Sequence, residues 1–413
     1  MASRIKSIAV LSVHTCPVAA LGGKKTGGMN VYVRELAREL GKHGIQVDIF
    51  TRCESEEAAE IRRLGPNVKV IHVASGPGKT LAPIEIYPHL EEFTRNVEGY
   101  QQKQGSTYDL LHSHYWLSGL VALKLQRHWG IPVLQNFHTL GKVKNLFLKK
   151  PEPPVRLIAE RRIIDRVDRI IAATQDELAH LENLYDADVS KISIIPPGVD
   201  TNRFQPKPQS LAKAKIGVSQ KKQLILFVGR LEPIKGLETL LKAIAILKKR
   251  SPKDANGDIT YPNLSLAIIG GEDQDRYFKA IKQKAGKLGI GETTSFLGSQ
   301  DQRVLPNYYS AAEVTIIPSS HESFGIVALE SMACATPVIV SNVGGLQYLV
   351  EHKKTGILVP PDKSEPLAVA IKMLLEDHER KKSLGKNAHQ KAQHYAWPKI
   401  TSKITKLYRE TTR

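Results

Sequence analysis

The stretch His321-Glu322-Ser323-Phe324-Gly325-Ile326-Val327-Ala328-Leu329-Glu330 decides how the rest of the chain is interpreted. The apolar residues 314–318 precede it and predict a buried strand, while residues 324–333 follow at helical spacing. Glu322 is therefore expected in the turn between strand and helix. Glu330 is expected about two turns into the helix.

The start of that helix lies between the two carboxylates and predicts an anion site. The first backbone N–H groups of a helix have no partner within it, and the helix dipole is positive there. Carboxylates on both sides of a phosphate site suit a ligand with hydroxyls at both ends. A nucleotide sugar is such a ligand, with ribose at one end and hexose at the other. The alternative is an ordinary helix with one capping carboxylate and one exposed Glu.

Length and composition predict a two- or three-domain cytoplasmic protein. The chain has 413 residues, and a domain averages about 150 residues. Its 3 cysteines show no metal spacing and indicate a reducing compartment. The apolar residues 8–11 form too short a run for a signal peptide. No stretch approaches the roughly 18 apolar residues of a membrane span. Membrane association is disfavoured as well, since no apolar amphipathic helix with a basic face stands out in the first domain.

The net charge of +18 favours anionic partners of some kind. Nucleic acid is disfavoured, since no basic stripe interleaved with aromatic residues is present. Part of the excess lies in runs such as residues 248–250 and 380–382. Solvated helix ends account for such runs without any binding patch.

Two alternating α/β series predict the fold class. Residues 5–13 read as a strand, followed by the glycine-rich loop Gly22-Gly23-Lys24-Lys25-Thr26-Gly27-Gly28 and a helix at residues 31–40. This βαβ start places the loop to hold a phosphate, although a flexible loop is the alternative. The turn-rich Pro196-Pro197-Gly198-Val199-Asp200 ends the first series, and a strand at residues 224–228 begins the second. We predict two doubly wound, Rossmann-like domains, residues 1–198 and 199–396, facing across a cleft.

Cations and histidines are the candidates for chemistry. Arg230 and Lys235 flank a proline-containing turn after the first strand of the second series, where both can reach a diphosphate. Two surface cations beside a turn are the alternative. Metal ligation by Asp273-Gln274-Asp275 is the weaker interpretation. A zinc cluster of His112, His114 and His138 lacks suitable spacing and carboxylates. His138 is expected to contact substrate if the cleft exists, although a lone His is more often structural.

In this order, the motifs resemble family 4 of the glycosyltransferases, which have the GT-B fold. The resemblance covers nearly the whole chain, residues 8–397. The inositol-phosphate N-acetylglucosaminyltransferases of mycothiol synthesis look nearest, followed by sucrose-phosphate synthases. The motifs are Gly27-Gly28-Met29-Asn30-Val31-Tyr32-Val33, His112-Ser113-His114-Tyr115-Trp116-Leu117-Ser118-Gly119, His138-Thr139-Leu140, Pro197-Gly198-Val199-Asp200, Gly229-Arg230 with Lys235, and Glu322 with Glu330.

The resemblance implies the donor site. Arg230 and Lys235 would bind the diphosphate, Glu330 the ribose hydroxyls and Glu322 the sugar hydroxyls. His138 would lie near the reacting carbon. Backbone groups would complete the site at Gly27, Gly28, Ser323, Phe324, Gly325 and Ile326.

It also implies the acceptor site and the reaction type. Acceptor contacts would come from Asn30, Tyr115, Thr139 and Arg156. A lysine that grips the acceptor phosphate in these relatives is replaced by Pro83, and Lys79 nearby would substitute for it. The family retains anomeric configuration and uses neither metal nor cofactor. In relatives a segment corresponding to residues 397–413 returns to the first domain.

The sequence thus predicts a metal-independent, retaining glycosyltransferase. It would move a hexosyl group from a nucleoside diphosphate sugar, UDP-linked by resemblance, to a small polyol, sugar or sugar phosphate. The alternatives are transfer to fructose 6-phosphate, transfer to a lipid at a membrane surface, a non-catalytic nucleotide-sugar binding protein, and a phosphorylase with a lysine-bound pyridoxal cofactor. The oligomeric state stays open, a homo-oligomer included.

Overall fold

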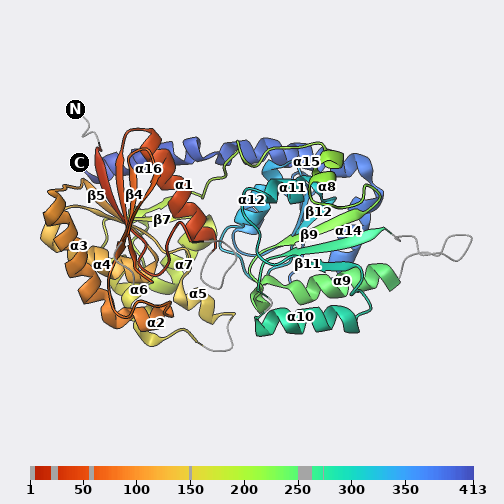
Figure 1. Cartoon of the computed structure of the whole chain (residues 1–413), viewed down its shortest axis with the longest axis horizontal. Helices are drawn as coiled ribbons and strands as arrows, with labels where there is room; N and C mark the ends of the chain where they lie inside the picture. The colour runs from red at the N-terminus through yellow and green to blue at the C-terminus, as the bar shows by residue number, and fades with distance from the viewer. Residues whose placement is uncertain (1–4, 20–26, 55–59, 148–150, 250–262, 273) are drawn as a thin grey trace, which may run out of the picture. The chain divides into compact units, whose positions relative to one another are not determined.

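The computed structural model describes residues 5–19, 27–54, 60–147, 151–249, 263–272 and 274–413. These residues form two compact units (Figure 1). The first unit is made by the chain up to Ala19, by Gly28–Gly198 and by Trp397–Arg413. The second contains Val199–Ala396. Each has its own sheet and its own apolar core, so the units are described separately.

Within the described residues, the first sheet has eight strands in the order β3-β4-β2-β1-β5-β6-β7-β8. All neighbours pair in parallel except β3 and β4, which are antiparallel at one edge. The inner strands are buried on both faces because helices cover both, as in other parallel sheets. The strands are β1 (Ser7–Leu11), β2 (Gln46–Arg52), β3 (Ile61–Gly65), β4 (Val68–Val73), β5 (Leu110–His114), β6 (Val133–Asn136), β7 (Arg169–Ala172) and β8 (Ile192–Ile194).

The helices of the first unit include the last helix of the chain. That helix, α16 (Trp397–Thr411), packs on α1 and contributes Trp397, Ile400 and Tyr408 to the same apolar core. Residues in the left-handed conformation end α3 at Gly105 and α4 at Gly130, where glycine lacks the Cβ penalty. The other helices are α1 (Gly28–Lys42), α2 (Pro83–Ile86), α3 (Leu90–Gln104), α4 (Tyr115–Trp129), α5 (Gly141–Asn145), α6 (Pro154–Arg166) and α7 (Gln175–Tyr185), with 3₁₀ turns at Tyr87–His89 and Val189–Lys191.

The second sheet is entirely parallel among the residues that the structure describes, in the order β11-β10-β9-β12-β13-β14. Its strands are β9 (Gln223–Val228), β10 (Leu264–Ile269), β11 (Thr294–Phe296), β12 (Val314–Ile317), β13 (Val338–Ser341) and β14 (Ile357–Val359). Its helices are α8 (Gln209–Lys215), α9 (Leu237–Lys249), α10 (Arg276–Lys287), α11 (Leu305–Ala311), α12 (Ile326–Ala333), α13 (Leu346–Leu349), α14 (Ser364–Glu376) and α15 (His378–Ala392), with 3₁₀ turns at Pro233–Lys235 and Gln393–Tyr395.

Both sheets have the topology of a doubly wound fold. In the second sheet, the chain leaves β9 toward β10 on one side and later returns to β12 on the other. In the first sheet the same reversal falls between β1 and β5. Ligands of open α/β sheets bind outside the carboxyl ends of the strands at such a reversal. The predicted fold class of two Rossmann-like units is confirmed, and the reversals show where each unit presents a site.

None of the helices within the described residues has the length and apolar character needed to cross a membrane.

Candidate active site

The turn after β12 carries Glu322, as the sequence predicts. Gly325 has a φ of 104° and caps α12, which begins at Ile326. The carbonyl of Glu322 accepts a 2.8 Å bond from the Gly345 N–H, and a Cβ at Gly344 would lie 2.2 Å from the same oxygen. The loop after β13 therefore packs directly on this turn and fixes its backbone.

Lys235 and Glu322 form an ion pair at the point where the second sheet reverses. The Lys235 Nζ lies 2.6 Å from Glu322 Oε2, and both side chains are 20% exposed. The backbone supports the pair, since Ser320 N–H donates to the Ile234 carbonyl at 2.8 Å. A Cβ at Gly236 would lie 1.9 Å from the Pro318 carbonyl oxygen. The turn after β9 and the turn after β12 are thus in direct backbone contact.

Arg230 stands at the same edge, two residues after the end of β9. Its Nη1 donates to Glu232 Oε1 at 2.7 Å, and its side chain is 40% exposed. The sequence predicts that Arg230 and Lys235 act on one diphosphate. The structure places both in the loop that follows β9 and gives each a carboxylate partner.

Glu330 is anchored inside the second unit. Its residue is 5% exposed, its Oε1 accepts from Gln302 Nε2 at 3.0 Å, and its Oε2 accepts from the Tyr309 hydroxyl at 2.8 Å. Burial, together with the Glu330 charge, raises the pKa of Tyr309 well above its ordinary value. Gln302 in turn accepts from Arg203 Nη1 at 2.8 Å. The alternative of an exposed Glu330 is wrong, because two neighbouring segments hold its carboxylate.

Among the other predicted donor contacts, four lie at the start of α12: Ser323, Phe324, Gly325 and Ile326. The Phe324 ring is buried and packs against Tyr395, with ring centres 5.9 Å apart. Gly28 is the first residue of α1 and Gly27 directly precedes it. The rest of the predicted glycine loop, Gly22–Thr26, lies outside the described residues, as does Asp273 of the weak metal candidate.

Three histidines gather at the carboxyl edge of the first sheet. His112 Nδ1 is 2.6 Å from the Tyr408 hydroxyl and its Nε2 is 2.6 Å from Asn136 Oδ1. Since Asn136 Nδ2 donates to the Ile171 carbonyl, its Oδ1 is the acceptor, so His112 carries its proton on Nε2. Its Nδ1 then accepts from Tyr408, a residue of the last helix. Asn136 therefore fixes the tautomer of His112, and the Tyr408 hydroxyl satisfies the remaining ring nitrogen.

His138 follows β6 with a φ of 60°, in the left-handed region. Its Nε2 is 3.0 Å from His114 Nδ1. Burial lowers the pKa of His112 to about 4 and that of His138 to about 3, with the neighbouring His112 adding to the effect on His138. The pKa of His114 is also well below its ordinary value, chiefly through burial. All three imidazoles are neutral at pH 7. The described residues contain no group of three or more His, Cys, Asp or Glu side chains arranged to hold a metal ion.

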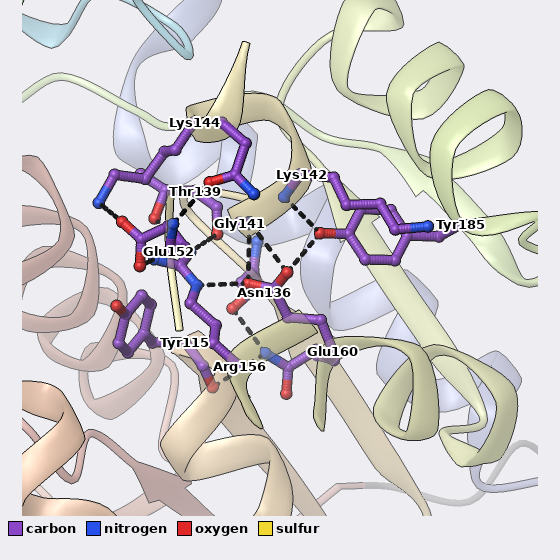
Figure 2. Close-up of polar contacts among 12 residues, drawn as sticks. Tyr115, Asn136, Thr139, Gly141, Lys142, Lys144, Glu152, Arg156, Glu160 and Tyr185 are labelled. Atoms are coloured by element: carbon purple, nitrogen blue, oxygen red, sulfur yellow. Dashed lines mark hydrogen bonds and ion pairs between the residues drawn. The ribbon is translucent and has the colours of Figure 1, made fainter. Parts of the chain in front are cut away.

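Tyr115, Thr139 and Arg156, which the family resemblance assigns to the acceptor, meet in the first unit (Figure 2). Arg156 Nη2 donates to the Thr139 carbonyl at 2.8 Å and to its hydroxyl at 3.1 Å. The guanidinium lies 4.9 Å from the centre of the Tyr115 ring. Tyr115 has a φ of 76°, an unfavourable conformation for a residue with a large side chain. The structure brings these three together although they come from different elements.

Two carboxylates that the sequence analysis missed complete this cluster. Glu160 is fully buried and accepts from Arg156 Nε at 2.7 Å, from Gly141 N–H at 2.9 Å and from the Tyr185 hydroxyl. Glu152 accepts from Arg156 Nη1 at 2.9 Å and pairs with Lys144. The spacing Arg156–Glu160 is i,i+4 on a charged helix, a signal that predicts such a pair.

Asn30 and Lys79 have different surroundings from this cluster. Asn30 is buried on α1, and its Nδ2 donates to Thr15 Oγ1 at 2.7 Å and to the Cys16 carbonyl at 2.8 Å. It therefore ties down the loop after β1. Lys79 is exposed in the loop between β4 and α2. Among the described residues, no ion pair or hydrogen bond joins Lys79 to Arg156.

A cavity in the first unit belongs to neither site. It is lined by residues of α3, α4 and the segments that lead into β5 and β6, among them Glu98, Tyr108 and Trp129. These segments lie at the amino ends of the strands. The candidate residues lie at the carboxyl ends, which is the functional edge of such a sheet.

Comparison with known proteins agrees with this architecture. Residues 26–203 match the model described as Glycosyltransferase Family 4, and residues 209–391 match Glycosyl transferases group 1. The chain is 38% identical over 413 residues to the D-inositol 3-phosphate glycosyltransferase of Saccharomonospora viridis, covering 98% of this chain and 94% of that protein.

Solved structures show the same two-unit fold. Sucrose-phosphate synthase from Thermosynechococcus elongatus has a TM-score of 0.89 at 33% identity and covers 98% of both chains. The Anabaena protein HepE has a TM-score of 0.75 at 19% identity, covering 98% of this chain and 99% of that one. Two Rossmann-like units with these matches define a glycosyltransferase of the GT-B class. The chain belongs to glycosyltransferase family 4.

Proposed function

We propose that this enzyme is a retaining glycosyltransferase that moves a hexosyl group from a nucleoside diphosphate sugar to a small polyol, sugar or sugar-phosphate acceptor. The second unit would bind the donor and the first would bind the acceptor. The main support is the ion pair between Lys235 and Glu322, whose Nζ and Oε2 lie 2.6 Å apart. This pair lies between β9 and β12, where the strand order of the second sheet reverses. A cation and a carboxylate held side by side suit a ligand that presents phosphate next to sugar hydroxyls.

UDP is the proposed nucleotide. The titles of solved structures of the Anabaena protein HepE name UDP with glucose and UDP-glucose. Those structures share the fold at 19% and 20% identity, so they support a UDP-sugar donor without fixing the hexose. Glu330 would accept the ribose hydroxyls, with Tyr309 and Gln302 holding its carboxylate in place. Residues 323–326 would offer backbone N–H groups.

The proposed diphosphate contacts are Arg230 and Lys235. A lysine ammonium has three donors, so Lys235 can keep its bond to Glu322 and still donate to a phosphate oxygen. Arg230 would add a planar fork of donors suited to phosphate. These two cations would neutralise the leaving diphosphate, and the reaction would then require neither metal nor cofactor. Gly27 and Gly28 would let the backbone approach the phosphate closely.

The proposed mechanism is transfer on one face of the sugar. The bond from the anomeric carbon to the phosphate oxygen breaks, and that oxygen takes the proton of the acceptor hydroxyl. The acceptor oxygen then bonds to the anomeric carbon from the same side. Glu322 would hold sugar hydroxyls and is not assigned the role of nucleophile. Positioning and electrostatic stabilisation of the departing charge would supply most of the rate.

His138 would lie against the sugar as a neutral hydrogen-bonding group. In the favoured arrangement, His114 Nδ1–H donates to His138 Nε2, which leaves His114 Nε2 as an unprotonated acceptor. That nitrogen is buried without a hydrogen-bond partner, and a buried acceptor without a partner costs less free energy than a buried N–H without one. His138 would then present Nδ1–H to the substrate. Its left-handed backbone would aim that group, and its low pKa would keep the ring uncharged.

For the acceptor, the relatives point toward a polyol phosphate. The similar protein of Saccharomonospora viridis is named for D-inositol 3-phosphate, and the similar solved structure is a sucrose-phosphate synthase. The cluster of Tyr115, Thr139 and Arg156 is the proposed acceptor site. Asn30 and Lys79, which lie in other surroundings, are proposed as further acceptor contacts through the family resemblance. Transfer to fructose 6-phosphate is the second candidate, favoured by the 33% identity to that synthase.

The test is a transfer screen with purified full-length enzyme. UDP-, ADP- and GDP-linked hexoses are each combined with inositol phosphate, fructose 6-phosphate and their unphosphorylated forms. Product configuration is read by NMR, with and without a chelator. A retained anomeric configuration that is insensitive to chelator supports the proposal. Inversion, or dependence on added metal, contradicts the mechanism. Absence of transfer from every nucleotide sugar contradicts the function.

A further inference from the structure

Arg156 is held between two carboxylates that differ in their surroundings. Glu152 lies four residues before it, and Glu160 four residues after it. The Glu160 side chain is 0% exposed, belongs to α6 and bonds three different donors. Glu152 lies just ahead of α6, with its side chain 14% exposed. Glu160 is therefore locked into the interior, whereas solvent reaches Glu152.

The two oxygens of Glu152 contact two different cations. Oε2 accepts from Arg156 Nη1 at 2.9 Å, and Oε1 pairs with Lys144 Nζ, a side chain that is 34% exposed (Figure 2). Burial opposes ionisation of Glu152, but the charges of Arg156 and Lys144 outweigh it and hold its pKa below the ordinary value. Glu152 is thus an anion that bridges two cations at the edge of the cluster.

The remaining donors of Arg156 point to interior partners. Nε donates to Glu160, and Nη2 donates to both oxygens of Thr139. The guanidinium itself is 1% exposed and rests against the Tyr115 ring. An anion that arrives from solvent can therefore reach Arg156 by taking the place of Glu152, and it would meet Lys144 at the same position.

We propose that Glu152 is an exchangeable counter-ion that selects phosphorylated acceptors. It occupies the position on Arg156 and Lys144 that the phosphate of such an acceptor takes when it binds. Without acceptor, Glu152 satisfies Nη1 of the buried guanidinium, while Glu160 stays on Nε. A buried donor of a charged group is costly to leave without an acceptor. A phosphate compensates both cations when Glu152 moves away. A neutral acceptor cannot do so, and it leaves Glu152 in place.

This inference rests on the proposed function in one respect, since it takes the Arg156 cluster as the acceptor side. Its physical core is independent of turnover: the cluster should bind an anion, and Glu152 should compete with it. Removing the charge of Glu152 removes that competition. We expect phosphate to bind about tenfold more tightly, a size typical of close charge pairs at binding sites.

The experiment compares full-length wild-type protein with Glu152→Gln. Glutamine keeps the size and an acceptor oxygen but loses the charge. Glu91→Gln is the matched control, because Glu91 is an exposed residue of α3 paired with Lys124, and its loss changes net charge equally. Inorganic phosphate binding is measured by calorimetry. Transfer to a hexose phosphate and to the matching free hexose is measured separately.

The expected result is a roughly tenfold lower Kd for phosphate in Glu152→Gln and wild-type affinity in Glu91→Gln. The ratio of kcat/KM for hexose phosphate over free hexose should rise by a similar factor. Equal or weaker phosphate binding in Glu152→Gln overturns the proposal, as does the same gain in Glu91→Gln, which would reflect net charge alone.

A second variant keeps the proposal testable if Glu152→Gln does not fold. Lys144→Gln in the otherwise wild-type protein removes the exposed cation of the pair and should weaken phosphate binding severalfold. Unchanged phosphate affinity in that folded variant counts against the exchange. If no nucleotide sugar supports transfer, the proposed function fails. The phosphate affinities from calorimetry still test whether Glu152 competes with a bound anion.

Discussion

The Lys235–Glu322 pair and the Arg156–Glu160 pair place a cation beside a carboxylate in each unit, but they differ in exposure. Lys235 and Glu322 are each 20% exposed at a sheet edge. Arg156 and Glu160 are 1% and 0% exposed and have further internal partners. A half-open pair can exchange bonds with a ligand. An enclosed pair holds its neighbours in one geometry, so its loss should appear first in stability.

Glu160→Ala should break the enclosed pair with the largest effect. It leaves the Arg156 guanidinium, the Gly141 N–H and the Tyr185 hydroxyl without their common acceptor. We expect unfolding free energy to fall by about 3–5 kcal/mol, as for other buried charges that lose one partner. Chemical denaturation measures it. Asp165→Ala, at an exposed site on the same helix, is the control. An equal loss of unfolding free energy in Asp165→Ala would show that the enclosed position of the Arg156–Glu160 pair has no special effect on stability.

Lys235→Ala tests the half-open pair through catalysis. The activation free energy should rise by about 3–4 kcal/mol, with a corresponding fall in kcat, because one hydrogen-bond donor to the developing negative charge is lost. Stability should change little, because the pair is partly solvated. The measurement is kcat at saturating donor, with Lys242→Ala on the exposed side of α9 as control. Near-normal turnover in a folded Lys235→Ala protein would refute the diphosphate assignment.

Acid should destabilise the first unit through its neutral histidines. Burial depresses the folded pKa of His112 to about 4 and of His138 to about 3. The unfolded value is about 6.5, so their contribution is present above that pH and is lost as pH falls toward the folded values. Between pH 7 and 5.5 we expect about 1 kcal/mol of lost stability from each. Denaturant titrations at both pH values check this. His112→Gln should flatten the pH dependence.

Tyr309→Phe should have the smallest effect on activity, and it tests whether Glu330 contacts the donor. The substitution removes the 2.8 Å bond to Oε2 while Gln302 keeps the other oxygen in place. We expect the donor KM to rise by a factor that corresponds to about 1 kcal/mol, with a smaller change in kcat. Tyr308→Phe, one residue away on α11, is the control. An unchanged KM would mean that Glu330 does not contact the donor.

Regular, apolar elements of the fold could be predicted from the sequence. The strand expected at residues 224–228 is found at Gln223–Val228, and the helix expected at residues 31–40 lies within Gly28–Lys42. The edge strand Ile61–Gly65 has no such signal, because it is exposed and carries two arginines. The helix Leu90–Gln104 is mostly polar and buries few side chains, so its pattern is weak.

For the candidate site, the sequence indicated residue types and their loops but not their partners. Lys235 and Glu322 are 87 positions apart, and no local rule pairs them. Gln302 and Tyr309 reach Glu330 because of how the chain folds around β12, again without a spacing signal. Glu160 is different, since its i,i+4 relation to Arg156 is local.

The helix that ends the chain has a consequence for synthesis. A ribosome releases residues in order, and the first unit cannot complete its interior until Trp397, Ile400 and Tyr408 have emerged. Most of the second unit, Val199–Ala396, is synthesised before that segment and is therefore available to fold first. Chimeras that exchange acceptor preference between relatives must therefore transplant both pieces of the first unit together. A nascent chain stalled before Tyr408 would leave the buried Nδ1 of His112 without its hydroxyl partner.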